Sequence, residues 1–250
     1  MELAVMSLNL RGPDDPPPHD WPSRRPRLAA LLARVEPDVV GTQEALAPML
    51  EQLCADAPAE RPLAWSGRDR LGGHEDEHCA VVYRSDRWRP VAGGDVALSA
   101  SPDRLGTRWT ATQGFPRMAT WVRLASRGGT GEVVLVNTHL DHVCPQSRLL
   151  AARQLCGLVG EVAGDAPVVL TGDVNAEPGS QLAGVLAGCL EPVLPTAGRA
   201  PRTFHGYGTG SGCIDWVLAR GVEVLGAEVL DDGPPVSDHH PVLATLRVPG

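Results

Sequence analysis

Seven short apolar runs constrain the fold of this 250-residue chain more than any other feature. Each run is bounded by Gly, Pro, Asp or Asn and is rich in Val, Leu and other strand-forming residues, which predicts β-strands. The runs cover residues 2–8, 78–84, 119–125, 132–140, 166–173, 213–219 and 240–248. Helical spacing of apolar residues falls between them, over 24–35, 42–53, 146–162 and 179–187. Many strands with fewer helices favour packed sheets that carry helices on their outer faces.

Three stretches rich in Gly, Pro or charge are expected to be loops: 11–23, 66–76 and 198–212. Apolar strand signals resume directly after each of them, so none is typical of a linker between domains. The hydrophobic content of 43% is sufficient for a sizeable core. We therefore expect a single domain over residues 1–250, with the three loops framing a pocket.

The acidic balance of the chain limits its partners. Lys plus Arg number 22 and Asp plus Glu number 30, which gives a net charge of −8, and the sequence contains no block of basic residues. A dedicated duplex-DNA binder is therefore not expected, because such proteins contact phosphates with clustered Lys and Arg. Substrates that carry phosphate stay compatible with this charge, since clustered carboxylates can hold metal ions that locally invert it.

The six cysteines are scattered and show neither a C-x-x-C pair nor a Cys/His spacing for structural zinc. Most are expected to be small buried residues: Cys54, Cys79, Cys144, Cys156, Cys189 and Cys213. The N-terminus lacks the charged and apolar regions of a signal peptide, and no apolar stretch reaches membrane-spanning length. We expect a monomer in the cytoplasm, with no membrane anchor.

Polar side chains recur at the ends of the predicted strands. Five of them end or directly follow an apolar run: Asn9, Asn137, His139, Asp173 and Asn175. One such residue alone is more easily explained as a turn former. Together with Glu44, Asp215 and the S-D-H-H-P run at 237–241 they favour a shared site, because strand ends hold catalytic groups rigidly. Carboxylate, amide and imidazole groups suit Mg²⁺ or Mn²⁺ better than they suit a thiolate-binding metal.

Two metal-dependent folds can be tested on the same segments. A metallo-β-lactamase-like site requires H-x-H-x-D-H, whereas 137–142 reads N-T-H-L-D-H, with asparagine in place of the first histidine. A calcineurin-like phosphoesterase requires G-D-x-x-D, and Ala176 stands where its second aspartate belongs. Each pattern loses a metal ligand, which counts against both folds.

Six segments, taken in order, resemble the motifs of the endonuclease/exonuclease/phosphatase superfamily. They are S-L-N-L-R at 7–11, T-Q-E at 42–44, N-T-H-L-D-H at 137–142, G-D-V-N-A-E-P at 172–178, I-D-W-V-L at 214–218 and S-D-H-H-P at 237–241. Six ordered motifs across essentially the whole chain are far more specific than any one of them. The resemblance implies an α/β (α+β) fold, a four-layer sandwich of two packed mixed, mostly antiparallel β-sheets flanked by helices. It also implies a phosphoester hydrolase that uses Mg²⁺ or Mn²⁺.

The resemblance further implies a role for individual residues. Glu44 would be the principal metal ligand, since a carboxylate suits a hard cation, and Asp238 would complete the metal and water network. Asn9 would position the metal or the scissile phosphate. Asp173 and Asn175 would orient the attacking water and contact the phosphate, with the amide acting as a fixed dipole.

The remaining implied roles concern histidines and their partners. His239 would contact the phosphate or activate water, held by Asp215. His139 resembles the second family histidine, and Glu77 falls where nuclease-type members place a carboxylate that orients it.

Two more residues are candidates for contact with the substrate. Arg117 corresponds to a family arginine that contacts substrate phosphate, although a surface salt bridge explains it equally well. His205 lies in a Gly-rich loop and is expected to line the substrate cleft. His240 alternates away from its neighbour on an extended segment and is expected to be structural.

The expected reaction is attack of water on a phosphodiester or phosphomonoester, with no covalent intermediate. The absence of basic tracts counts against a duplex nuclease, and the missing export signal and membrane element count against a sphingomyelinase. Small soluble phosphoesters remain, as do single-stranded RNA or DNA ends cleaved by a deadenylase-type nuclease. A non-catalytic phosphate-binding module on the same fold is a different class; it predicts losses at Glu44, Asp173 or His239, and none is lost.

Overall fold

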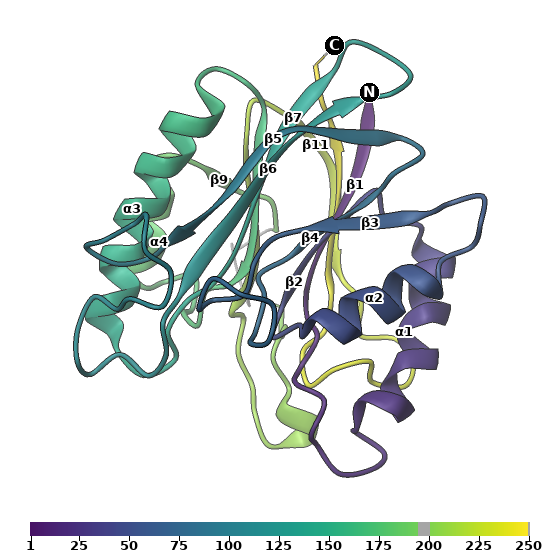
Figure 1. The fold of residues 1–250 in the computed structure, drawn as a ribbon, viewed down its shortest axis with the longest axis horizontal. Helices are drawn as coiled ribbons and strands as arrows, with labels where there is room; N and C mark the ends of the chain where they lie inside the picture. Colours follow the sequence, from purple (N-terminus) through teal and green to yellow (C-terminus); the bar gives the residue numbers. More distant parts are fainter. Residues whose placement is uncertain (195–200, 250) are drawn as a thin grey trace.

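Two six-stranded β-sheets face each other in the computed structural model, which describes residues 1–194 and 201–249 (Figure 1). The first sheet contains, in spatial order, β11 (Glu223–Val229), β12 (Val242–Arg247), β1 (Glu2–Asn9), β2 (Val39–Gln43), β4 (Val81–Arg84) and β3 (Leu63–Ser66). The second contains β5 (Trp88–Ala97), β6 (Met118–Ser126), β7 (Glu132–His139), β8 (Val168–Asp173), β10 (Asp215–Arg220) and β9 (Glu191–Pro192). Each sheet has one parallel pair, β1/β2 or β7/β8, among antiparallel neighbours, which confirms the predicted sandwich of mixed, mostly antiparallel sheets.

Helices cover the outer face of each sheet, and the apolar side chains alternate accordingly. In β1, Leu3 and Val5 point into the core between the sheets, whereas Met6 and Leu8 pack under the helices α1 (Trp21–Val35) and α2 (Ala47–Ala55). The helices α3 (Pro145–Ala163) and α4 (Gln181–Leu186) cover the second sheet in the same way (Figure 1). Because both faces of the central strands are buried, their sequences are almost continuously apolar.

Several predicted boundaries were wrong. The helix predicted over 42–53 begins only at Ala47, because Thr42 and Gln43 are the last residues of β2 and Glu44 turns the chain with a left-handed φ of 56°. The loop predicted over 11–23 ends earlier, since α1 starts at Trp21. Part of the predicted 198–212 loop lies outside the described residues; its described part contains a short 3₁₀ helix, Gly206–Gly208.

The cysteines also depart from the expectation. Cys156 and Cys189 form a disulfide, while three of the other four, Cys79, Cys144 and Cys213, are buried thiols. The predicted cytoplasmic location stays a prediction. None of the helices in the described part of the chain has the length and apolar character needed to cross a membrane.

A buried polar contact joins the two sheets beneath the strand ends. The Asn137 side chain of β7 donates through Nδ2 to the carbonyl oxygens of Thr42, at 2.7 Å, and Ala80, at 2.9 Å. Its Oδ1 accepts from Gln43 Nε2 at 2.7 Å and from Thr171 Oγ1 at 3.0 Å. The amide is fully satisfied and completely buried, so it fixes the end of β2 against β7 and β8.

Candidate active site

The strand register brings the predicted polar residues into one row. His139, the last residue of β7, lies opposite Asp173, the last of β8, and Asp173 lies opposite Asp215, the first of β10. In the other sheet Asn9 ends β1 beside Gln43, so Glu44 follows at the same edge. The parallel pairs β1/β2 and β7/β8 therefore end at one side of the sandwich, where catalytic groups are held by rigid strands.

A cleft of about 360 Å³ opens at this edge. Its lining combines carboxylates, imidazoles, arginines and two phenylalanines: Arg11, Glu44, Glu77, Phe115, Arg117, His139, His142, Asp173, Asn175, Phe204, Ile214, Asp238 and His239. Eight of these lining residues were predicted from the sequence as site residues: Glu44, Glu77, Arg117, His139, Asp173, Asn175, Asp238 and His239. The other three predicted site residues, Asn9, Asp215 and His205, do not line the cleft.

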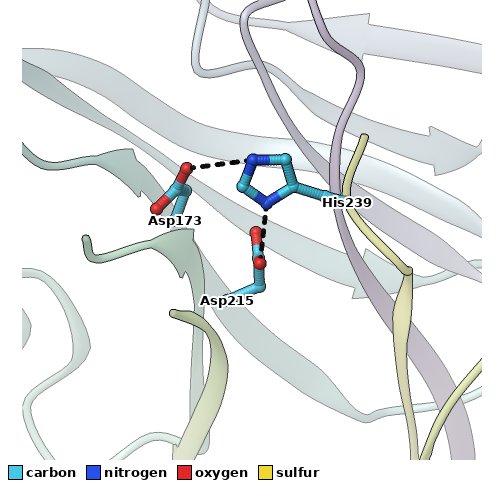
Figure 2. A group of neighbouring side chains, drawn as sticks. All are labelled: Asp173, Asp215 and His239. Carbon is cyan, nitrogen blue, oxygen red and sulfur yellow. Dashed lines mark hydrogen bonds and ion pairs between the residues drawn. The ribbon is translucent and has the colours of Figure 1, made fainter. Parts of the chain in front are cut away.

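His239 lines the cleft, and Figure 2 shows its ring between the carboxylates of Asp173 and Asp215. Its Nδ1 is 2.8 Å from Asp215 Oδ2 in a hydrogen bond, and its Nε2 is 3.8 Å from Asp173 Oδ2. All three side chains are buried, and a buried charge is stable only when opposite charges or hydrogen bonds compensate it. The ring orientation and its tautomer are therefore fixed by Asp215.

The surroundings shift the pKa values of this group strongly. Burial lowers the pKa of His239, but the Asp215 carboxylate more than offsets this, with help from Asp173 and Asp238, and raises it to about 10. Burial and the nearby Asp215 raise the pKa of Asp173 to about 7. The pKa of His139 is held well below its usual range by burial and by the charge of Arg117. Perturbed groups concentrated in one cleft are typical of a functional site.

Asn9 connects the two halves of the site. Its Nδ2 donates to Glu44 Oε1 at 2.9 Å and to Asp173 Oδ2 at 3.1 Å, and its Oδ1 accepts from the Arg11 backbone at 2.9 Å. Asp173 Oδ1 accepts from the Asn175 backbone at 3.0 Å. Asn9 thus holds two carboxylates of different sheets at a fixed separation.

The model of the endonuclease/exonuclease/phosphatase family matches residues 6–239. This chain belongs to the endonuclease/exonuclease/phosphatase family. Members of the family hydrolyse phosphoester bonds, so the predicted enzyme class is confirmed.

Solved structures of bacterial family members are similar to this one over their full length. An endonuclease/exonuclease/phosphatase from Bacteroides vulgatus has a TM-score of 0.91 at 26% identity and covers 100% of both chains. A mannosyl-6-phosphatase from Bacteroides thetaiotaomicron has a TM-score of 0.86 at 25% identity, over 98% of this chain and 99% of that one. Among curated proteins, Carbon catabolite repressor protein 4 homolog 3 of Arabidopsis thaliana is 27% identical over 177 residues, 67% of this chain. The match covers only 36% of that relative's length.

Members of this family generally use a divalent metal ion. Two groups of side chains in this protein could hold one. Asp173, Asp215 and His239 each place a ligand atom within 4.8 Å of the others. However, Asp215 is fully buried behind the His239 ring, is bonded to it and does not line the cleft. Glu44 and Asp238 both line it, and burial together with the Glu44 charge raises the pKa of Asp238. Both offer the carboxylate oxygens that Mg²⁺ and Mn²⁺ prefer as ligands.

Two contacts predicted from the sequence, those of Glu77 and His205, were wrong. Glu77 lines the cleft but does not orient His139: its Oε2 accepts from Arg70 Nη1 at 2.8 Å, and His139 Nδ1 has no hydrogen-bond partner among the described residues. His205 does not line the cleft: its ring lies against that of His240, with centroids 4.3 Å apart, and its Nδ1 accepts from the Tyr207 backbone N–H at 3.2 Å. Phe204 lines the cleft instead, with its ring centroid 4.8 Å from that of His239.

Arg117 is a cleft residue of the family member rather than part of a surface salt bridge. It is only 6% exposed, and its Nη2 lies 3.3 Å from His142 Nδ1. Reasoning from the sequence missed Arg11, Phe115 and the other apolar lining residues. Three missed lining residues stood within the family motifs, which could have signalled them: Arg11, His142 and Ile214.

Proposed function

We propose that this chain is a metal-dependent hydrolase of small soluble phosphoesters, with its active site in the cleft around His239. The observation that carries the proposal is the placement of His239 between Asp215 and Asp173, beside the carboxylates of Glu44 and Asp238. Burying so many ionisable groups costs stability. A catalytic role accounts for that cost.

Asp173 is placed to receive the proton of the attacking water. Its Oδ2 faces three groups at once: Asn9 Nδ2 at 3.1 Å, His139 Nε2 at 3.6 Å and His239 Nε2 at 3.8 Å. Asn175 lines the cleft beside it and uses its Nδ2 to donate to the Leu140 carbonyl at 3.0 Å, which leaves its Oδ1 to orient water. A carboxylate and an amide oxygen side by side can hold one water in line with a phosphorus atom.

The phosphate itself needs donors where negative charge develops. His239, His139 and Arg117 line the same cleft and supply imidazole and guanidinium N–H groups. Donors fixed in place by buried partners stabilise this charge without reorganising, as Asp215 does for His239. The three side chains would therefore bind the phosphoryl oxygens in the ground state and more strongly in the transition state.

Glu44 and Asp238 would hold Mg²⁺ or Mn²⁺. Such an ion, when bound, neutralises phosphoryl charge and polarises the bond to be cleaved. Asn9 positions Glu44 and Asp173 with hydrogen bonds from both of its amide hydrogens, so we assign it to placing the ligands instead of coordinating the ion.

A small substrate is favoured over a nucleic-acid strand. The net charge is −8 and the sequence contains no basic block that would track a backbone. The structural neighbour of 25% identity is named a mannosyl-6-phosphatase, which supports a small phosphorylated substrate for this chain as well. We also propose that the chain forms one domain, because the central core cluster takes residues from both sheets.

The test is an assay of chelator-treated protein on a panel of phosphomonoesters, phosphodiesters and single-stranded oligonucleotides, with Mg²⁺ or Mn²⁺ added back. Asp173→Ala and His239→Ala should each lower kcat by about 10²-fold or more, the usual effect of losing a proton-transfer or charge-stabilising group. Asp86→Ala, which removes an exposed ion pair with Arg84, is the matched control and should keep full activity. No cleavage anywhere in the panel, or full activity of both cleft variants, would contradict the proposal.

A further inference from the structure

Loops of the two sheets touch each other on both sides of the cleft. Beside Arg11, the ring of His19 stacks on that of Tyr207 with centroids 3.7 Å apart and an interplanar angle of 22°. On the other side, the guanidinium carbon of Arg70 lies 4.5 Å from the ring centroid of Phe115. Figure 1 shows the loop after β1 beside the Gly206–Gly208 helix. A polymer lying between the sheets would have to break both contacts, whereas a terminal group can enter between them.

Arg11 is held in place at the wall of this cleft. Its Nε and Nη2 donate to the two carboxylate oxygens of Asp15, at 2.9 and 3.1 Å. Its backbone carbonyl accepts from the fully buried guanidinium of Arg24 at 3.0 Å. The Arg11 side chain stays 41% exposed, and its Nη1 takes part in no hydrogen bond with any residue of 1–194 or 201–249. A donor fixed in this way is prepared for an anionic ligand.

The charges around Arg11 indicate which ligand that is. Its Nε lies 3.9 Å from Asp238 Oδ2, and its charge also acts on Glu44. A fixed guanidinium beside two carboxylates opposes the binding of a cation there. An anion that contacts both the cation and the arginine removes this conflict. Arg117 approaches the cleft from the second sheet, so two arginines from different sheets face one bound group.

We propose, on the basis of the function proposed above, that the cleft takes the terminal phosphate of a phosphomonoester and that Arg11 binds this phosphate. A monoester carries a charge of about −1.5 to −2 at neutral pH and three free oxygens. A diester has a single charge and two free oxygens, and its two ester groups must extend out of the site in two directions. Two arginines, two histidines and a metal ion match the charge and the three free oxygens of a monoester, and they are more than the single charge and two free oxygens of a diester require.

The test compares Arg11→Gln with the wild type on p-nitrophenyl phosphate and on bis(p-nitrophenyl) phosphate. The wild type should prefer the monoester, and the variant should lose about tenfold or more in kcat/KM for the monoester but less than about threefold for the diester. Arg11→Lys keeps the charge but loses the two-bond contact of the guanidinium with Asp15, so its kcat/KM for the monoester should fall between those of the wild type and Arg11→Gln. Arg25→Gln is the matched control, because Arg25 forms the same two-bond ion pair with Asp56 on the surface and should lose nothing.

Mn²⁺ binding to the free protein, followed by electron paramagnetic resonance, separates this role from a structural one. Arg11→Gln should bind Mn²⁺ as tightly as the wild type or more tightly, since a repelling charge is gone. Weaker Mn²⁺ binding, or equal losses for both esters, would overturn the role of Arg11. A wild type that cleaves the diester at least as well as the monoester would overturn the substrate class and leave the proposed function standing. Cleavage of neither ester would overturn both.

Discussion

Replacing Asn137 by leucine should cost more stability than any other substitution of a single uncharged polar side chain near the site. The variant keeps the volume but removes four buried hydrogen bonds that join β7 to β2, to β8 and to Ala80, the residue before β4. Two of the partners keep another bond: Gln43 Nε2 still reaches the Gly41 carbonyl and the Ala80 carbonyl still accepts from Thr42. At about 0.5–1.5 kcal/mol for each bond, with some compensation, the expected loss is roughly 2–4 kcal/mol.

Urea unfolding followed by tryptophan fluorescence and circular dichroism measures this loss, since the chain has six tryptophans. The melting temperature should fall by roughly 4–16 °C, because each kcal/mol corresponds to about 2–4 °C in a domain of this size. Gln154→Leu is the matched control: it removes one amide bond, to the Ala97 carbonyl at 2.7 Å, and should cost about 1 kcal/mol. If Asn137→Leu were no more costly than Gln154→Leu, the two sheets would not depend on this contact.

Three further outcomes follow from the same structure. Gly41→Ala should lower the free energy of unfolding by about 1–3 kcal/mol, because an added Cβ would lie 1.9 Å from the Thr171 hydroxyl oxygen; Gly226→Ala, with open space around it, should be nearly neutral in the same urea titration. Asp69→Ala should lower the free energy of unfolding by roughly 2–4 kcal/mol and speed amide hydrogen exchange over 71–76, because the Asp69 carboxylate accepts hydrogen bonds from four backbone N–H groups there. Unchanged exchange over 71–76 would contradict this role of Asp69. In metal-free protein, the pKa of His239 lies above its ordinary value of 6.5. The stability that protonated His239 contributes is therefore fully present below pH 6.5 and is lost as the pH rises through about 10. Asp215→Asn should lower this pKa in an NMR titration, and an unchanged pKa would refute the pairing of Asp215 with His239.

The sequence predicted the central strands because they are buried on both faces and their apolar runs are continuous. It did not predict β5, whose W-R-P-V-A-G-G-D-V-A sequence lies largely exposed at a sheet edge and carries Pro and two Gly. The predicted helix included Thr42 and Gln43, because the apolar residues over 42–53 have helical spacing. These two residues belong to the short strand β2, which becomes evident only from its pairing with β1 and β4. Edge strands and short central strands depend on tertiary pairing, which local patterns do not contain.

The candidate site could be predicted where motifs end a strand and not where loops decide the contact. Asp173 and His139 meet because strand register fixes them, and the family pattern placed Asp215 on His239 correctly. Glu77 instead bonds Arg70 on its own loop, a choice set by the loop conformation. Arg11 escaped notice because its position depends on Asp15 and the buried Arg24, which only the folded chain brings together.

The most direct test of the central claim is anomalous scattering from a crystal of this protein soaked in Mn²⁺ and inorganic phosphate. The account predicts one manganese peak at Glu44 and Asp238, with a phosphate in contact with Arg11, Arg117 and His239. A peak between Asp173 and Asp215, or no peak in the cleft at millimolar Mn²⁺, would contradict it.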